Sequence, residues 1–335
     1  MRNIHLLVWI VFGMLFFIQC NQTKTITNEH TSIGKKNEIS IVVETELWNS
    51  SIGDSIRKQV LKSSFAFLET EPCFDLVHYT PRLFKEEAKK SRNILYISSD
   101  TSIDTFEYKK NKYASPQNYF LISATSTEKL NELISKNADS IIKVYKETEI
   151  EQEKHSLKDR GVHSQKNFET LFGINMTLPL DYHLAMYSEE PFLWYQKTLP
   201  SGDVNIIIYE VSFLDLKNNQ SIEEIFLQAH DSIGKNFVRG VKENTYLKTS
   251  ELIKIKKSTY DEDILDVYRI RGTWQMENDI LKGMFISYVF RDDYYNRFLI
   301  VEGIINAPNK PHRDFVIEMD AIFQSVDFYK SNMPF

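Results

Sequence analysis

The sequence predicts an α+β fold: two similar-sized domains, each a mainly antiparallel sheet packed with helices, behind a lipidated flexible N-terminal tether. Short β-branched and aromatic runs alternate with longer segments whose apolar residues recur every three or four positions. Hydrophobic residues make up 42% of the 335 residues, with only 11 Gly and 9 Pro. This composition is typical of a globular chain with an ample core.

The N-terminus has the residue order of an export signal. Arg2 supplies the positive end, positions 4–18 carry no charged side chain, and Cys20 follows. The apolar run is about 15 residues, shorter than the roughly 20 that a membrane-spanning helix needs. We therefore predict a signal peptide at residues 1–19, and an uncleaved N-terminal anchor with an incidental Cys20 is the alternative.

The residues before Cys20 resemble the processing site of bacterial lipoproteins. That resemblance implies that Cys20 becomes the first mature residue and carries a diacylglycerol and an amide-linked acyl chain such as palmitate. Two or more acyl chains make membrane anchoring effectively permanent. Residues 20–36 are polar and are predicted to be the tether. No acidic run follows Cys20, which favours attachment to the outer membrane facing the periplasm.

Residues 37–160 are predicted to form the N-terminal α+β domain. A helix is expected to begin near Asp54, and Ser126 stands in the N-cap position of a second, long helix. The apolar stripe of that helix fades after Ile150, so the charged stretch 149–160 is predicted to be a solvated helix end that connects the domains. The expected strands are 38–44, 74–79, 93–98 and 119–124.

Residues 161–335 are predicted to form the C-terminal α+β domain. One helix begins after the N-cap Ser221, and a final helix follows Pro311. Short connections such as Arg291–Tyr294 favour antiparallel pairing. The two halves share a rough order of strands closed by a helix, which raises the suspicion of an internal duplication. The expected strands are 192–197, 205–212, 247–255, 264–273, 282–290 and 298–305.

Several short segments carry a family resemblance. They include Trp48–Arg57 (WNSSIGDSIR), Ser91–Leu95 (SRNIL) and Gly283-Met284-Phe285 with the later Ala307-Pro308. These segments resemble an uncharacterised lipoprotein family of Bacteroidota, domain of unknown function 4837. The resemblance extends over nearly the whole mature sequence. The resemblance implies an envelope lipoprotein and brings no activity. In element order, the second half is also weakly similar to the PsbP/Mog1-like sandwich.

Charge and motifs exclude several classes of function. The formal net charge of −6 argues against nucleic acid or anionic lipid headgroups as the main partner, although local basic patches remain compatible with it. The sequence has no Gly-rich phosphate loop, no His-Glu-x-x-His zinc motif and no G-x-S-x-G elbow. Cys73 is predicted to be a small buried residue. We therefore expect no catalytic residues, no metal and no cofactor.

Carboxylate pairs leave one enzymatic alternative open. Asp261-Glu262-Asp263 and Asp292-Asp293 lie in predicted hairpin turns, where Asp is common because turns are solvated. Two such acids held about 5–9 Å apart could hydrolyse a glycan. An envelope hydrolase that acts on a glycan or a similar substrate is thus the alternative function.

A polar binding patch is the other candidate site, and it lies in the first domain. Arg suits bidentate recognition of carboxylates, and a Trp could form one wall of the patch. The simpler interpretation is that Glu71 or Asp75 pairs with Arg92 and fixes the order of the strands. The candidate residues are Trp48, Asp54, Arg57, Glu71, Asp75 and Arg92.

The leading hypothesis is a lipid-anchored cell-envelope protein that acts as a non-enzymatic binding or assembly module. Its expected partners are the membrane, through the lipid on Cys20, and an envelope protein or glycan.

Overall fold

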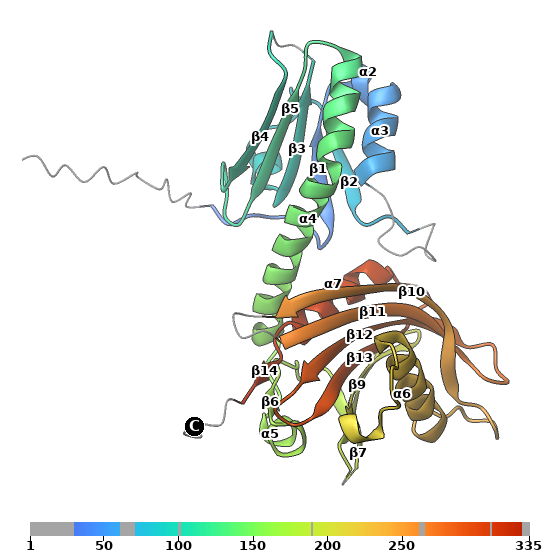
Figure 1. Ribbon diagram of the computed structural model, residues 1–335. Helices are drawn as coiled ribbons and strands as arrows, with labels where there is room; N and C mark the ends of the chain where they lie inside the picture. Colours follow the sequence, from blue (N-terminus) through green and yellow to red (C-terminus); the bar gives the residue numbers. More distant parts are fainter. Residues whose placement is uncertain are drawn as a thin grey trace, which may run out of the picture.

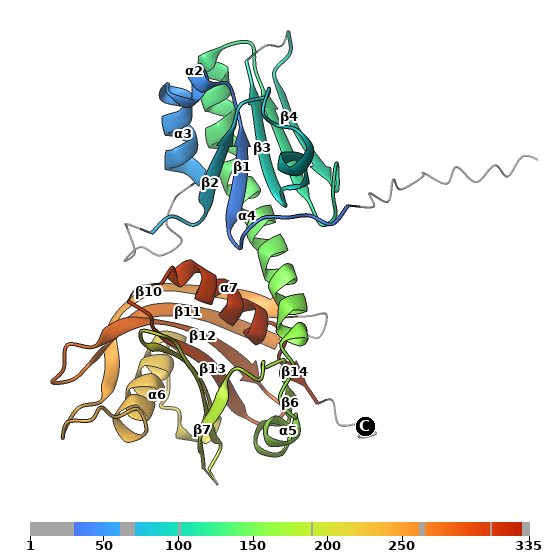
Figure 2. The same ribbon diagram turned by 180° about the vertical axis from the view of Figure 1, so that it is seen from behind.

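Two β-sheets joined by one long helix organise the chain. The computed structural model describes residues 30–60, 71–99, 102–188, 190–260, 265–308 and 310–329. A five-stranded sheet forms the N-terminal domain and a seven-stranded sheet forms the C-terminal domain. Helix α4 (Thr127–Asp159) runs from the first domain to the second (Figure 1, Figure 2). The prediction of two α+β domains is confirmed.

The N-terminal sheet has the strand order β2-β1-β3-β5-β4. β1 pairs with β2 and β3 in parallel, β3 pairs with β5 in parallel, and only β4 is antiparallel. The prediction of a mainly antiparallel sheet is wrong for this domain. Helix α3 (Ser51–Val60) lies between β1 and β2 in the chain, and such a crossover connection permits parallel pairing. The strands are β1 (Glu38–Val42), β2 (Asp75–Tyr79), β3 (Asn93–Ser98), β4 (Thr105–Lys110) and β5 (Asn118–Ser123).

The C-terminal sheet has the order β10-β11-β12-β13-β9-β8-β7, and every neighbouring pair is antiparallel, as predicted. The exposed edge strand β7 was not predicted. The strands are β7 (His183–Tyr187), β8 (Phe192–Thr198), β9 (Asp203–Ser212), β10 (Leu247–Tyr260), β11 (Leu265–Met276), β12 (Lys282–Asp292) and β13 (Arg297–Asn306), with β6 (Ile174–Asn175) and β14 (Asp327–Phe328) paired separately.

Helices lie on both faces of the C-terminal sheet. α6 (Ile222–Asn236) lies on one face, and α7 (His312–Phe323) lies on the other (Figure 1). The predicted N-cap Ser221 is confirmed, because its side chain accepts a hydrogen bond from the backbone N–H of Glu224 at 3.2 Å. Each helix covers a separate apolar core. The smaller helices are α2 (Thr45–Trp48), α5 (Lys166–Phe172), and the 3₁₀ turns η1 (Glu86–Lys90) and η2 (Phe213–Asp215).

Helix α4 belongs to both domains. Ser126 caps it, as predicted, by accepting a hydrogen bond from the N–H of Lys129. Its N-terminal part packs on the N-terminal sheet through residues between Leu130 and Tyr145, and Leu157 near its C-terminal end packs in the C-terminal core. The prediction of a solvated helix end is wrong, because Glu149 and Glu153 are only 1% and 4% exposed. Burial of these acids is tolerated because Lys36, Arg92 and the C-cap residue of α4, Arg160, pair with them.

Within the described ranges, no helix is both long enough and apolar enough to cross a membrane. The predicted signal peptide and Cys20 lie outside those ranges.

Candidate functional site

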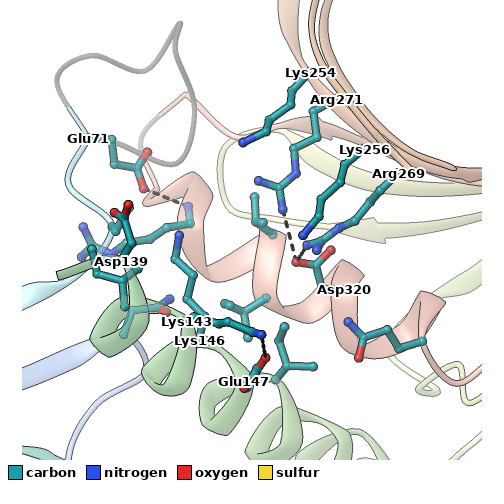
Figure 3. A pocket seen from close by; sticks show the side chains of 18 of the residues that line it. Glu71, Asp139, Lys143, Lys146, Glu147, Lys254, Lys256, Arg269, Arg271 and Asp320 are labelled. Atoms are coloured by element: carbon teal, nitrogen blue, oxygen red, sulfur yellow. Dashed lines mark hydrogen bonds and ion pairs between the residues drawn. The ribbon is translucent and has the colours of Figure 1, made fainter. Parts of the chain in front are cut away.

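A cavity of about 550 Å³ lies where the two domains meet. α4, α7, the strands β10 and β11, and the segment that includes Glu71 surround it (Figure 3). Seven basic and four acidic side chains line it, an excess of three formal positive charges in a protein of net charge −6. The basic residues are Lys143, Lys146, Lys254, Lys256, Arg269, Arg271 and Arg313, and the acidic ones are Glu71, Asp139, Glu147 and Asp320.

Four of these cations come from neighbouring positions on β10 and β11. Lys254 is directly opposite Arg271, and Lys256 is directly opposite Arg269. Side chains alternate between the two faces of a strand, so all four lie on the same face, while the intervening Ile270 is buried in the core under α6. Like charges directly opposite each other destabilise a strand pair. This arrangement therefore favours a bound negative charge.

Asp320 of α7 neutralises only part of this charge. It accepts hydrogen bonds from Arg269, from Arg271 at 3.4 Å and from the Tyr288 hydroxyl at 3.1 Å. Burial, together with the neighbouring Arg269, lowers the pKa of Arg271 despite the opposing effect of Asp320. No carboxylate of the described residues forms an ion pair with Lys254 or Lys256, and both lysines are exposed.

Helix α4 provides the opposite wall. Lys143 lies 3.8 Å from Glu147, and both side chains are exposed. Burial lowers the pKa of Lys146, although nearby groups including Cys73 partly oppose this shift. The charged form of a partly buried ammonium group with a lowered pKa is stabilised by an added anion. Apolar side chains complete the lining, namely Ile142, Ile150, Val316 and Ile317.

Glu71 holds the two domains together at the rim of the cavity. Its carboxylate accepts hydrogen bonds from the backbone N–H groups of His312 at 3.1 Å and Arg313 at 2.8 Å. The residue preceding α7, Pro311, provides no side-chain cap. Glu71 therefore caps α7 from the other domain. Burial opposes ionisation, but the bonds from His312 and Arg313 outweigh it, so the pKa of Glu71 is lowered.

The six residues of the predicted polar patch make contacts in three separate groups. Arg57 lies over the Trp48 ring, 4.6 Å from its centre, and pairs with Asp54 at 2.8 Å. Arg92 binds Glu149 at 2.8 Å, whereas Asp75 binds Arg313 of α7 at 2.7 Å.

The expected ion pair between Arg92 and Glu71 or Asp75 is thus wrong. Arg92 instead meets a carboxylate of α4, and both acids meet α7. Among the six residues, only Glu71 lines the cavity.

The predicted carboxylate pairs have different surroundings. Asp292 is buried and binds Arg297 at 3.0 Å, and Asp293 binds Arg291 at 2.9 Å. Both acids thus have cationic partners. Asp261-Glu262-Asp263 lies outside the described residues. Cys73 is buried, as predicted, and borders the cavity.

Sequence reasoning missed the cations of β10 and β11. A pattern that could have revealed them is present in the sequence. Lys254-Ile255-Lys256 and Arg269-Ile270-Arg271 each place two cations two residues apart in a strand. The alternation of strand side chains puts each pair on one face. Only the register of the two strands places the pairs opposite each other.

Comparisons with known proteins locate two families on the chain. Residues 161–325 match a domain of unknown function, DUF4837. The resemblance to this family is therefore confirmed for the second half, but residues 32–158 match a different domain of unknown function, DUF8532.

Solved structures and curated proteins add little to these matches. The Ran-binding protein Mog1p of Saccharomyces cerevisiae is similar at 7% identity and a TM-score of 0.31, covering 46% of this chain and 89% of its own. No curated protein matches the chain.

Proposed function

We propose that this protein is a lipid-anchored envelope lipoprotein whose two folded domains form a non-enzymatic binding module for an anionic ligand. The opposed cation pairs Lys254–Arg271 and Lys256–Arg269, facing a cavity between the domains, carry the ligand part of the proposal. A ligand there contacts both domains at once. The leader, with Cys20 after its apolar run, motivates the envelope part.

The cation pairs favour binding over simple protection of a sheet edge. Lysines are common on edge strands because they discourage pairing with other chains, and β10 is an edge strand. However, Arg269 and Arg271 lie on β11, which is paired on both sides. Edge protection therefore does not explain their charges. Asp320 supplies one negative charge for the two arginines, and an anionic ligand would balance the rest.

A titration tests the ligand part. The full-length acylated protein in a neutral detergent is titrated with pyrophosphate and with citrate, and glucose serves as the uncharged control. We expect at least one polyanion to bind, with an affinity that falls as NaCl is raised, because screening weakens charge attraction. Failure of both polyanions to bind would overturn this part of the proposal.

A single substitution tests the anchor. Cys20→Ala should move the protein from the membrane fraction to the soluble fraction without changing its thermal unfolding, because the predicted N-terminal domain begins only at residue 37. Continued membrane fractionation of the variant would contradict lipid anchoring. Outer-membrane attachment facing the periplasm predicts that added protease reaches the protein only after the outer membrane is opened.

A further inference from the structure

We infer that the ligand of the interdomain cavity is an organic phosphate, with a phosphate group on the β10–β11 cations and an apolar portion against α4 and α7. This inference rests on the proposed function and specifies the class of its ligand. It is carried by the number of cations, by their geometry and by the apolar part of the cavity lining.

The charge of the cavity matches a phosphate better than a carboxylate. The lining has three more positive than negative charges, and a carboxylate brings only one negative charge. A phosphate monoester carries about −1.5 to −2 at pH 7 and has three acceptor oxygens. One such group can accept hydrogen bonds from several of the four cations.

The geometry also supplies the donor types that phosphates use. Arg269 and Arg271 are adjacent on one strand face, and each presents a planar fork of N–H donors. Asp320 is shared by both guanidinium groups, and among the described residues the buried Nε–H of Arg269 has no hydrogen-bond acceptor. Lys254 and Lys256 add two mobile point charges, a mode in which lysine commonly binds phosphate.

The opposite wall indicates what is attached to the phosphate. Figure 3 shows Lys143 and Lys146 of α4 across the cavity from the strand cations, with α7 between them. Partly buried Ile142 and buried Ile150, Val316 and Ile317 also line the cavity. Because these residues are already largely out of water, the gain comes from the ligand's own hydrocarbon surface, which leaves water when it contacts them. This favours a ligand with a hydrocarbon portion over free phosphate.

Matched probes test the inference on the full-length protein in a neutral detergent, with blank titrations into detergent alone. Hexyl phosphate and hexanoate share one apolar chain and differ in the anionic group, and inorganic phosphate lacks the chain. We expect hexyl phosphate to bind at least about tenfold more tightly than either of the others, which corresponds to roughly 1.4 kcal/mol.

Two variants locate the binding. The double variant Lys254→Gln/Lys256→Gln should lower the affinity for hexyl phosphate by about tenfold or more, as expected for the loss of two close charges. Lys257→Gln is the matched control: it is the next residue on the same strand, pairs with Asp266 and does not line the cavity. It should leave the affinity within about twofold.

Each outcome has one meaning. If hexanoate and hexyl phosphate bound equally, the ligand would not be a phosphate in particular. The proposed function would still stand in that case, provided that pyrophosphate or citrate bound. If inorganic phosphate bound as tightly as hexyl phosphate, the inference that the ligand has an apolar portion would be wrong. An unchanged affinity in the double variant would place the site elsewhere.

A further titration separates two sources of such a ligand. Hexyl phosphate is first bound to the Cys20→Ala protein without detergent, and vesicles of neutral lipid, with or without phosphatidic acid, are then added as competitors. Competition by the phosphatidic acid vesicles indicates a lipid headgroup, and its absence indicates a soluble phosphate ester.

Discussion

Two charged clusters lie along the same two helices, and they differ in how their charges are balanced. The first, here called the balanced cluster, pairs four acids with four cations, for example Arg160 with Glu318 at 2.6 Å and Lys36 with Glu153 at 2.6 Å. The second is the cationic cavity, with seven cations and four acids. The members of the balanced cluster are Glu149, Glu153, Asp181 and Glu318 with Lys36, Arg92, Arg160 and Lys197.

The partners that each acid of α7 meets explain the difference. Glu318 and Asp320 are two residues apart on α7, and both are buried. Glu318 meets Arg160 and Lys197, so every charge of its cluster has an opposite partner. Asp320 faces two arginines whose neighbours on β10 are lysines. A closed, neutral cluster joins the domains, whereas an open, positive one is suited to take a ligand.

The largest expected effect is the loss of Glu318. Glu318→Ala should destabilise the protein by about 3–5 kcal/mol, because it leaves Arg160 and Lys197 with one acid fewer in a buried site. Urea unfolding at neutral pH measures it. Glu223→Ala, on the exposed side of α6, is the control and should change stability by less than about 0.5 kcal/mol. Equal effects of both substitutions would refute a structural role for the balanced cluster.

Asp320→Asn should have opposite effects on stability and on ligand affinity. Loss of the carboxylate removes charge-assisted hydrogen bonds to Arg269 and Arg271 and should cost about 2 kcal/mol of unfolding free energy. It also makes the cavity more positive, so the affinity for pyrophosphate should rise. Unfolding and titration of the same preparation measure both quantities. A fall in affinity with a fall in stability would show that Asp320 instead pre-organises the site.

Glu71→Gln tests the cap between the domains. The pKa of Glu71 is lower in the folded protein than its ordinary 4.5, so its ionised form adds stability above pH 4.5. That contribution is lost as the pH falls through the folded-state pKa. We expect the variant to be less stable by about 1 kcal/mol at neutral pH, as for other lost caps.

The pH dependence provides the control for Glu71. At about pH 3 the difference between the two proteins should shrink, because protonation neutralises the carboxylate in the native chain as well. A difference that stays constant from neutral to acidic pH would contradict the charged cap.

The smallest expected effect is a fractional proton uptake. The pKa of Lys146 is lowered by burial, and a bound anion should raise it again. Ligand binding at alkaline pH should therefore take up less than about one proton. Calorimetry in two buffers with different ionisation enthalpies measures the uptake, and Lys146→Met should abolish it. Identical heats in both buffers would place the anion away from α4.

Local patterns predicted many of the elements. The caps Ser126 and Ser221 and the apolar stripe of α4 are signals within one or two turns, and the structure confirms them. Strands β1, β3 and β5 also appear close to their predicted positions. β4 and β7 were missed; β7 is exposed along its whole length and so lacks the buried-face alternation used to recognise strands.

Long-range pairing could not be predicted in the same way. The parallel order of the first sheet, the partner of Arg92 and the cap that Glu71 provides to α7 all join residues far apart in the chain. Their sequence neighbours carry no information about which distant group meets them. The patch around Trp48 was therefore assembled from residues that the fold distributes among three sets of contacts.

The sequence by itself determined most of the helical and extended segments, the α+β class, and the two-residue spacing of cations in β10 and β11, because these depend on periodicity and caps. Only the tertiary structure decided that the two cation pairs face each other and that α4 and α7 enclose them with apolar side chains. Charge balance is the physical reason: whether a buried or half-buried ion has a partner depends on strand register and helix packing, and neither is a local property.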